Sequence, residues 1–462
     1  MRYRELRGFK GDLVYRYTSS IDHDHNIYRH VVKVMGAHLI ALKEAGVLSR
    51  DDYSMIAREL VELWHGDPAE VLKGDYEDVF EAIESRLHES IGPKAGWIAL
   101  GRSRNDHVSA VLRLYTIEAL AQVSKTLVNL REKLLDAALK YFNAILPGYT
   151  HGQPSQVISG ACLFQAYEEA LSEANEVVLH AIQLASKSPL GSGAGGGTMV
   201  DLDEDLLARL LGFRDKYSSP YHAVASRMFL HYAAQSLALV MVEVSRIAED
   251  LISLSQPGVE IVELPEEHIA TSSIMPHKAN PVTLEIMRAR ASEALASLHS
   301  IAAIQLKLRY SYNLDLQEAN RHLYNLAATT IQSIEALTDL ITGISINEDK
   351  ALEVLHRYKP WTAEVAEKHS LESKIPLRQA YEKTAQSIMK GTLQDLNPQE
   401  ILEIRRTGCT LERTKERIRQ SIRKMEEHKK ETIRHLETIE KTTQTILQKL
   451  QNTTNKTPNN TP

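Results

Sequence analysis

The segment Thr271–Pro281, TSSIMPHKANP, brings two adjacent hydroxyls, a lysine and an asparagine together within a short stretch of chain. An apolar, alanine-rich run follows at once, so the spacing predicts a polar loop that leads into a long helix. The free N–H groups and partial positive charge of a helix N-terminus stabilise anions. Ser272 or Ser273 could therefore act as a reactive hydroxyl beside Lys278 and Asn280, in chemistry that builds negative charge on a carboxylate.

The segment Gly101–Asp106, GRSRND, places two arginines around a serine directly before an apolar run with helical spacing. Two interpretations of this segment remain open. It either caps a helix and exposes its arginines to solvent, or it forms a carboxylate clamp, because a guanidinium donates two parallel hydrogen bonds to a carboxylate.

Two more polar segments have compositions that a simple connection between helices would not need. Pro147–Pro154, PGYTHGQP, holds His151 in a turn rich in proline and glycine. A lone histidine is more often structural than catalytic, but a turn between two long helices can present an acid that titrates near neutral pH. Ser188–Thr198, SPLGSGAGGGT, lacks the lysine and hydroxyl that end a phosphate-binding loop, so its glycines indicate close backbone approach or motion.

The elements that must position these segments are helices, since helical periodicity dominates and alternating strand patterns are nearly absent. Four long helices are predicted, at about 107–143, 156–187, 222–255 and 282–307. Helices of this length with apolar faces predict an all-α fold built around an extended bundle. Such a bundle exposes apolar surface unless it packs on copies of itself, so a homo-oligomer is expected.

The helical pattern divides the chain into four predicted parts. They are an N-terminal helical domain at 1–106, the central long-helix bundle at 107–358, a C-terminal helical domain at 359–450 and a disordered tail at 451–462. Within the C-terminal domain, Leu411–Leu450 indicates one long charged helix, either a coiled coil or, in preference, an amphipathic helix that lies along the domain. The tail lacks apolar residues, which is typical of disorder.

Composition excludes several classes of protein. A net charge of −6 and a pI of about 6.4 argue against a protein that mainly binds nucleic acid. The N-terminus lacks the apolar run of a signal peptide, and no apolar segment approaches the roughly 18–20 residues that cross a bilayer. Cys162 and Cys409 are far apart in the sequence, which predicts a reducing compartment and no disulfide framework. A soluble, cytoplasmic protein that binds neither nucleic acid nor membranes is expected.

Taken in order, the polar segments resemble the aspartase/fumarase superfamily of lyases and, within it, the argininosuccinate lyase family. TSSIMPHKANP is similar to the superfamily signature loop GSSxMPxKxNP, and GRSRND followed by PGYTH resembles argininosuccinate lyases in particular. Four further matches keep the family order: SSIDHD from Ser19, EDVFEAIE from Glu77, SPLGSGAGGGT from Ser188 and YNLDLQ from Tyr312.

The resemblance implies an all-α homotetramer in which each active site combines segments of three subunits. It further implies a lyase without cofactor or metal that cleaves argininosuccinate reversibly to arginine and fumarate, in arginine biosynthesis. A base removes a proton from the carbon beside a carboxylate, the charge spreads onto that carboxylate, and an acid protonates the departing nitrogen. Such a site needs a base, an acid and groups that stabilise a dianion.

The same resemblance assigns roles to individual residues. Ser272 is the base, His151 acts on the acid side, and Glu285 pairs with the histidine. Lys278 would stabilise the serine alkoxide and, with Asn280, hold the carboxylates of the fumarate end. The other matching positions are Ser103, Arg104, Asn105 and Thr150 at the fumarate end, Ser20, Asp24, Tyr312 and Gln317 at the arginine end, and Asp78 and Arg227 as weaker matches.

Several positions depart from the family pattern, among them Ala99, His107, Thr271, Ala279 and Asn320. These departures surround the proton-transfer residues and leave them intact, which supports the reaction class more firmly than the substrate. Two alternatives remain: a sister lyase such as an adenylosuccinate lyase, slightly favoured by His277, and a non-catalytic scaffold like the lens crystallins. A Ser–His–Asp hydrolase is disfavoured because no G-x-S-x-G elbow follows a strand.

Overall fold

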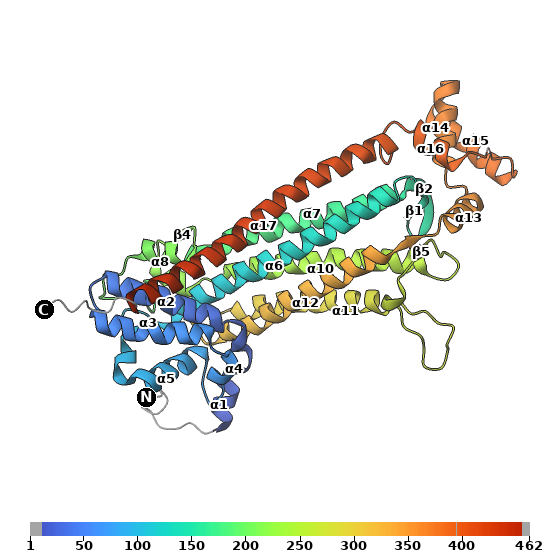
Figure 1. Ribbon diagram of the computed structural model, residues 1–462. Coiled ribbons are helices and arrows are strands. Elements are labelled where there is room, and N and C mark those ends of the chain that lie inside the picture. The colour runs from blue at the N-terminus through green and yellow to red at the C-terminus, as the bar shows by residue number, and fades with distance from the viewer. Residues whose placement is uncertain (1–11, 394, 455–462) are drawn as a thin grey trace.

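Long helices lie side by side and form the body of the molecule (Figure 1). The computed structural model describes residues 12–393 and 395–454. The helices of the body are α6 (Arg104–Lys140), α7 (Gly160–Ala185), α10 (Met228–Ser255), α11 (Val282–Gln305) and α12 (Asp315–Gly343). Their apolar faces share one hydrophobic core with the N-terminal helices. The predicted all-α fold with a central bundle is confirmed.

Helix α6 shows how the sequence makes these long helices. The Ser103 hydroxyl accepts the Asn105 N–H at 3.2 Å, and the Asp106 carboxylate accepts the Ser103 N–H at 3.0 Å. This capping box satisfies donors that the first helical turn leaves free, so α6 begins before the predicted start at His107. The face turned to the core includes the buried leucines Leu112, Leu120, Leu127 and Leu134.

Short helices cover the end of the bundle at which α6 and α10 begin and α11 ends (Figure 1). They are α1 (Asp12–Thr18), η2 (Ile21–Asn26), α2 (Tyr28–Glu44), α3 (Arg50–His65), α4 (Pro68–Val71), α5 (Val79–Ile91), η3 (Gly92–Ala99), α8 (Glu204–Leu211) and α9 (Pro220–Ala225). Strands β3 (Lys187–Ser188) and β4 (Asp215–Lys216) form a short parallel pair.

The opposite end carries a β-hairpin and the C-terminal helices (Figure 1). Strands β1 (Ile145–Thr150) and β2 (Gln153–Ser159) form this antiparallel hairpin between α6 and α7. Strand β5 (Val262–Glu263) pairs with β6 (Ser345–Ile346) in the same sense. The helices of this region are η4 (Glu266–His268), α13 (Glu348–Tyr358), α14 (Thr362–Ser373), α15 (Leu377–Met389) and α16 (Pro398–Ile404).

Two predicted helices are wrong in part. The helix predicted at 156–187 begins only at Gly160, because the preceding residues pair with β1. The helix predicted at 222–255 is interrupted, since the backbone is extended at Ser226, between α9 and α10. The helix predicted at 282–307 is confirmed as α11.

Helix α12 is a long helix that the sequence pattern did not predict. Its buried face includes Thr330 and Ser333, polar residues that hide the apolar stripe in the sequence. In the structure both hydroxyls donate to a carbonyl of the preceding turn at 2.8 Å, so the polar side chains are satisfied inside the core.

The long C-terminal helix α17 (Leu411–Thr454) runs back along α6 and α7 and reaches α2 and α3 (Figure 1). Its buried residues Ile418, Met425, Ile446 and Leu450 belong to the main core. It is therefore the amphipathic helix preferred above. The prediction of disorder from residue 451 is wrong up to Thr454, and the rest of the predicted tail lies outside the described residues.

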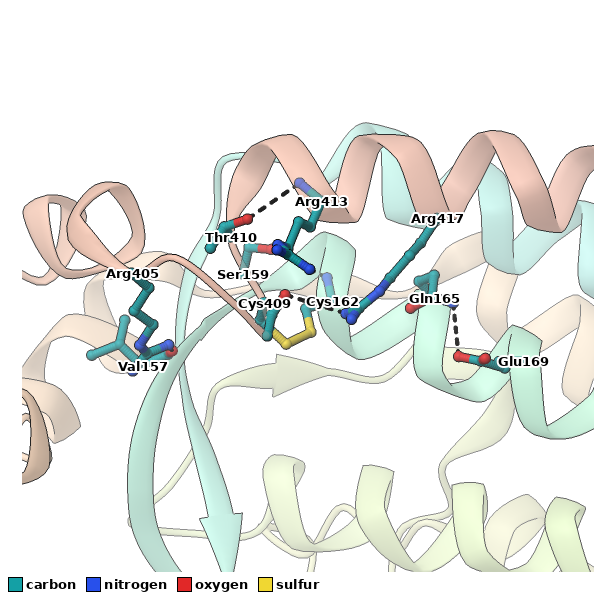
Figure 2. Close-up of a disulfide and its surroundings, with 11 residues drawn as sticks. Val157, Ser159, Cys162, Gln165, Glu169, Arg405, Cys409, Thr410, Arg413 and Arg417 are labelled. Carbon is teal, nitrogen blue, oxygen red and sulfur yellow. Dashed lines mark hydrogen bonds between the residues drawn. A yellow bond between two sulfur atoms is a disulfide. The ribbon is translucent and has the colours of Figure 1, made fainter.

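The predicted absence of a disulfide is also wrong. Cys162, in the first turn of α7, is bonded to Cys409, in the loop before α17, and their Cα atoms lie 5.9 Å apart (Figure 2). The sequence separates the two cysteines by 247 residues, and only the return of the chain along the bundle brings them together. The argument for a reducing compartment therefore loses its basis.

Two other predictions concern the chain as a whole. In the part of the chain that the structure describes, every helix is too short or too polar to cross a membrane. The domain boundaries predicted after residues 106 and 358 fall near the start of α6 and the end of α13. These boundaries stay predictions.

Candidate active site

The predicted site residues lie in two groups at opposite ends of the bundle. Arg104 begins α6, whereas His151 lies in the hairpin beyond its end, and the 37 residues of α6 span about 55 Å. Similarly, Ser272 precedes α11 and Tyr312 follows it, and the 24 residues of α11 span about 36 Å. Within one chain the two groups therefore cannot act on the same substrate molecule.

The first group lines a cavity of about 150 Å³, which we call the N-terminal pocket. Residues from η2, the start of α5, the start of α6, the α9–α10 junction and the start of α12 meet there. Its polar lining consists of Ser20, Asp24, Glu77, Asp78, Arg104, Asn105, Arg227, Tyr312, Gln317 and Asn320. The pocket thus gathers all four residues predicted for the arginine end of the substrate.

Two carboxylates give the N-terminal pocket its acidic side. Asp24 is 4% exposed and accepts hydrogen bonds from the Ser20 hydroxyl and the Val79 N–H, both at 2.9 Å. Burial raises the pKa of Asp24 to about 7. Asp78 caps α5 and accepts a hydrogen bond from Arg104 at 3.0 Å, yet burial still raises its pKa to about 6. A cationic ligand group would relieve both desolvated carboxylates.

Arg227 supplies the basic side of the same pocket. Its guanidinium is 1% exposed and donates to the carbonyls of Val224 and Ser226 at 3.2 and 3.0 Å. Its Nε and Nη2 atoms have no acceptor among the described residues. Burial, reinforced by the nearby Arg113, lowers the pKa of Arg227 to about 10. A carboxylate in the pocket would satisfy these buried donors.

Two other predicted residues at this end, Ser103 and Gln317, have fixed partners within the chain. Ser103 caps α6, and its neighbour Asp106 accepts the Gly193 N–H at 2.9 Å, which ties the glycine-rich loop to the helix. Gln317 donates to the Thr18 carbonyl at 3.1 Å. Burial raises the pKa of the Tyr312 hydroxyl.

Sequence reasoning did not assign two buried residues near this pocket. Arg113, on α6, stacks on Phe229 with its guanidinium 4.1 Å from the ring centre, and its Nε has no acceptor in the described residues. Asn320, on α12, lines the pocket with a buried Oδ1 that lacks a donor there. A charged or amide side chain on an apolar helix face was the available signal for both residues.

At the hairpin end, His151 and Gly152 form the two-residue turn between β1 and β2. Thr150 pairs with Gln153 across the turn, and the two turn residues have φ of 55° and 70°. Positive φ at both central residues is the type I′ turn that suits a right-twisted hairpin. Thr150 and His151 are exposed, so the hairpin presents the imidazole at its tip.

The loop predicted at Thr271–Pro281 is closed by two hydrogen bonds of 2.9 Å between the backbones of Ala270 and Asn280, just before α11. The Ser272 hydroxyl oxygen faces the backbone N–H groups of Ile274 and Met275 at 3.4 and 3.2 Å. Two donors aimed at one oxygen favour its ionised form, as a serine base requires.

Other groups around this loop face solvent. Lys278 and Glu285 are exposed, and Ile274 is 83% exposed. Among the described residues, no hydrogen bond or ion pair joins His151 to Ser272 or Glu285. The pairing of His151 with Glu285 therefore does not occur within this chain. No group of three or more His, Cys, Asp or Glu side chains in residues 12–393 and 395–454 could hold a metal ion.

Comparisons with known sequences give one family. A family model described as lyase matches residues 8–295. The argininosuccinate lyase of Pyrobaculum calidifontis is 39% identical over 402 residues, which are 87% of this chain and 93% of that protein. The enzyme of the same name from Sulfolobus acidocaldarius is 38% identical over 85% of each chain. That of Pyrococcus furiosus is 31% identical over 89% of this chain and 94% of its own.

Solved structures share the fold at lower identity. EDDS lyase in complex with formate has a TM-score of 0.84 and 19% identity, with 97% of this chain and 96% of that one covered. Class II fumarase from Schistosoma mansoni has a TM-score of 0.71 and 17% identity, over 86% and 94% of the two chains. At these identities the likeness shows the fold alone.

Proposed function

This chain belongs to the argininosuccinate lyase family of the aspartase/fumarase superfamily, and we propose how its residues carry out that family's reaction. It is a lyase that cleaves argininosuccinate to arginine and fumarate. The observation that carries the proposal is the pair of N–H groups aimed at the Ser272 oxygen, in the loop that contains Lys278 and leads into α11. The relatives also decide between the alternative lyases, since those at 37–39% identity are argininosuccinate lyases.

In the proposed reaction, Ser272 removes the proton from the carbon beside a succinyl carboxylate. The Ile274 and Met275 N–H groups stabilise the alkoxide, and Lys278 with Asn280 holds the carboxylate on which charge develops. His151, with Glu285 as its partner, acts on the acid side and delivers a proton to the departing guanidino nitrogen, directly or through water. The proton taken from carbon and the proton given to nitrogen balance the cleavage.

The arginine end of the substrate would occupy the N-terminal pocket. Asp24 and Asp78 offer acceptors for its cationic groups, and the unpaired donors of Arg227 offer a site for its carboxylate. Ser20, Tyr312 and Gln317 complete the lining. The fumarate end would then face Ser103, Arg104 and Asn105 at the mouth of the pocket, together with Thr150.

Because the two groups of residues are tens of ångströms apart in one chain, the complete site requires more than one subunit. Large apolar side chains are exposed along α10 and α11 and would be covered by partner copies. They include Leu239 (41% exposed), Ile286 (53%), Leu295 (41%) and Leu306 (68%). We therefore propose a homotetramer with sites shared between subunits, as the family resemblance implies.

A mixing experiment tests the shared site. Ser272→Ala and Asp24→Asn each remove one half of the site, so each variant alone should cleave argininosuccinate poorly at substrate concentrations well below the wild-type KM. After the two variants are dissociated and reassembled together, about a quarter of the sites should contain both native halves and regain activity. No regain of fumarate absorbance in a mixed tetramer, or a monomer by light scattering, would contradict the proposal. If Ser272→Ala alone kept full activity, Ser272 could not be the base.

A further inference from the structure

The hairpin that presents His151 has little support of its own. A two-stranded hairpin is marginally stable in water unless another element packs on it. Leu146 of β1 belongs to the main core of the bundle, whereas the buried Val157 of β2 does not. Val157 lies instead in a second hydrophobic cluster with Trp361, Ile401 and Leu402, all from the C-terminal helical region, while Ile145 of β1 packs against the same cluster.

A buried ion pair joins the same C-terminal region to β2. Arg405 donates to the Val157 carbonyl and to the Glu364 carboxylate, in the latter case through Nε at 2.9 Å and through Nη2. The side chains of Arg405 and Glu364 are 13% and 5% exposed. Gln156 of β2 donates to the same Glu364 oxygen at 3.0 Å. Strand β2 is thus bound at two successive residues.

The disulfide adds a covalent attachment at the end of the same strand. Figure 2 shows Cys409 bonded to Cys162 just beyond β2, with Arg405 reaching the strand at Val157. The hydrophobic contacts and the ion pair therefore act on β2, and the disulfide acts on the first turn of α7 just beyond it, in each case from one set of C-terminal residues. We call Trp361, Glu364, Ile401, Arg405 and Cys409 the C-terminal support.

We propose that the C-terminal support positions His151 for proton delivery, with Glu364, Arg405 and the Cys162–Cys409 disulfide as its positioning groups. This inference rests on the proposed role of His151 on the acid side. Among the described residues, none of the hydrogen bonds and ion pairs of Glu364 and Arg405 reaches His151 itself. The support acts by fixing β2, which begins two residues after His151. A small shift of the strand therefore moves the imidazole at the hairpin tip relative to a substrate held elsewhere.

The test compares two rates in the same protein under initial-rate conditions. The first is cleavage, followed by fumarate absorbance, and the second is incorporation of deuterium from heavy water at the Cβ of unreacted argininosuccinate, followed by NMR. Exchange needs the base alone, whereas cleavage needs both base and acid. A misplaced His151 should slow cleavage and let the carbanion return to exchanged substrate.

Glu364→Gln, Arg405→Gln and the double variant Cys162→Ser/Cys409→Ser should each lower kcat about 10- to 100-fold, the size expected for a displacement of roughly 1 Å. KM should change little, and the ratio of exchange to cleavage should rise about tenfold or more. Reduction of the wild-type disulfide with dithiothreitol should reproduce the double variant, and reoxidation should reverse it.

Glu168→Gln is the matched control. Glu168 forms an even more deeply buried ion pair with Arg131 at 2.7 Å, but that pair joins α6 and α7 within the bundle. Its loss should lower thermal stability and leave the ratio of exchange to cleavage unchanged.

The inference is overturned if cleavage is unaffected in the support variants, if exchange and cleavage fall in the same proportion, or if Glu168→Gln raises the ratio as much. Partial unfolding alone gives the proportional fall. Should Glu364→Gln fail to fold, the double cysteine variant and the reduction experiment decide in the same way. Failure of the proposed function looks different, because Ser272→Ala would then keep both exchange and cleavage.

Discussion

The N-terminal pocket and the hairpin end of the bundle differ in how completely one chain builds them. In the pocket, Asp24, Asp78 and Gln317 are each held by hydrogen bonds to other parts of the same chain. At the hairpin end, His151 and Glu285 are exposed and contact neither each other nor Ser272 within the described chain. One end is preformed, whereas the other presents its reactive groups outward.

This difference separates binding from chemistry. A preformed pocket with desolvated carboxylates and unpaired guanidinium donors recognises a charged ligand without rearrangement, because its partners are already oriented. In the proposed tetramer, the groups on the hairpin tip and the loop form a site only when a partner subunit brings the two ends together. Substitutions at one end should therefore change KM, and substitutions at the other should change kcat.

The largest effect is expected for Ser272→Ala. Loss of the proposed base should lower kcat by about 10²- to 10⁴-fold, the range of general acid–base catalysis. The N-terminal pocket is untouched, so arginine should bind to the variant as tightly as to the wild type in calorimetry. Weakened arginine binding would show that the two ends are not independent.

A smaller effect, of the opposite kind, is expected for Asp24→Asn. Loss of a buried charged acceptor should raise KM about 10- to 100-fold, as the loss of a hydrogen bond to a charged group does, with a lesser change in kcat. Asp22, exposed on the same η2 helix, provides the control variant Asp22→Asn. If Asp24→Asn lowered kcat alone in steady-state kinetics, the N-terminal pocket would not be the binding end that the comparison assumes.

Loss of the disulfide should lower the global stability of the chain and should increase local opening at the hairpin end alone. Because the bond closes a loop of 247 residues, Cys162→Ser/Cys409→Ser should lower the free energy of unfolding by roughly 2–4 kcal/mol. Hydrogen exchange measured by mass spectrometry should accelerate in β1 and β2 and stay unchanged in α2 and α5. Equal acceleration at both ends would mean that the bond stabilises the bundle as a whole.

The smallest effect concerns pH and the N-terminal pocket. Burial raises the pKa of Asp24 to about 7 and those of Asp78 and Asp106 to about 6, above the usual aspartate value. Between about pH 4 and 7 the folded state therefore binds more protons than the unfolded state, so stability falls as pH rises through this range. In Asp24→Asn, the decrease in the free energy of unfolding between about pH 4 and 7 should be smaller by on the order of 1–3 kcal/mol, measured by denaturant unfolding at several pH values. A steeper fall in the variant would contradict the burial of an uncompensated carboxylate.

Local patterns in the sequence predicted much of the molecule. The start of α11 at Val282 follows from the polar loop and the apolar run behind it, and the capping box at Ser103 explains the start of α6. The hairpin was hidden, since Pro147, Gly148 and Pro154 interrupt the alternation expected of strands. Its His–Gly turn also differs from the Asn–Gly pair that usually announces a type I′ turn.

The sequence by itself determined most of the long helices, the order of the motifs and the candidate reacting groups, because these depend on residues that are neighbours along the chain. Only the tertiary structure decided that Cys162 meets Cys409, that Glu364 and Arg405 hold β2, and that the candidate site residues of one chain lie at the two ends of the bundle. These contacts join segments that are up to hundreds of residues apart. Their formation depends on how long helices return past one another, which no local pattern specifies.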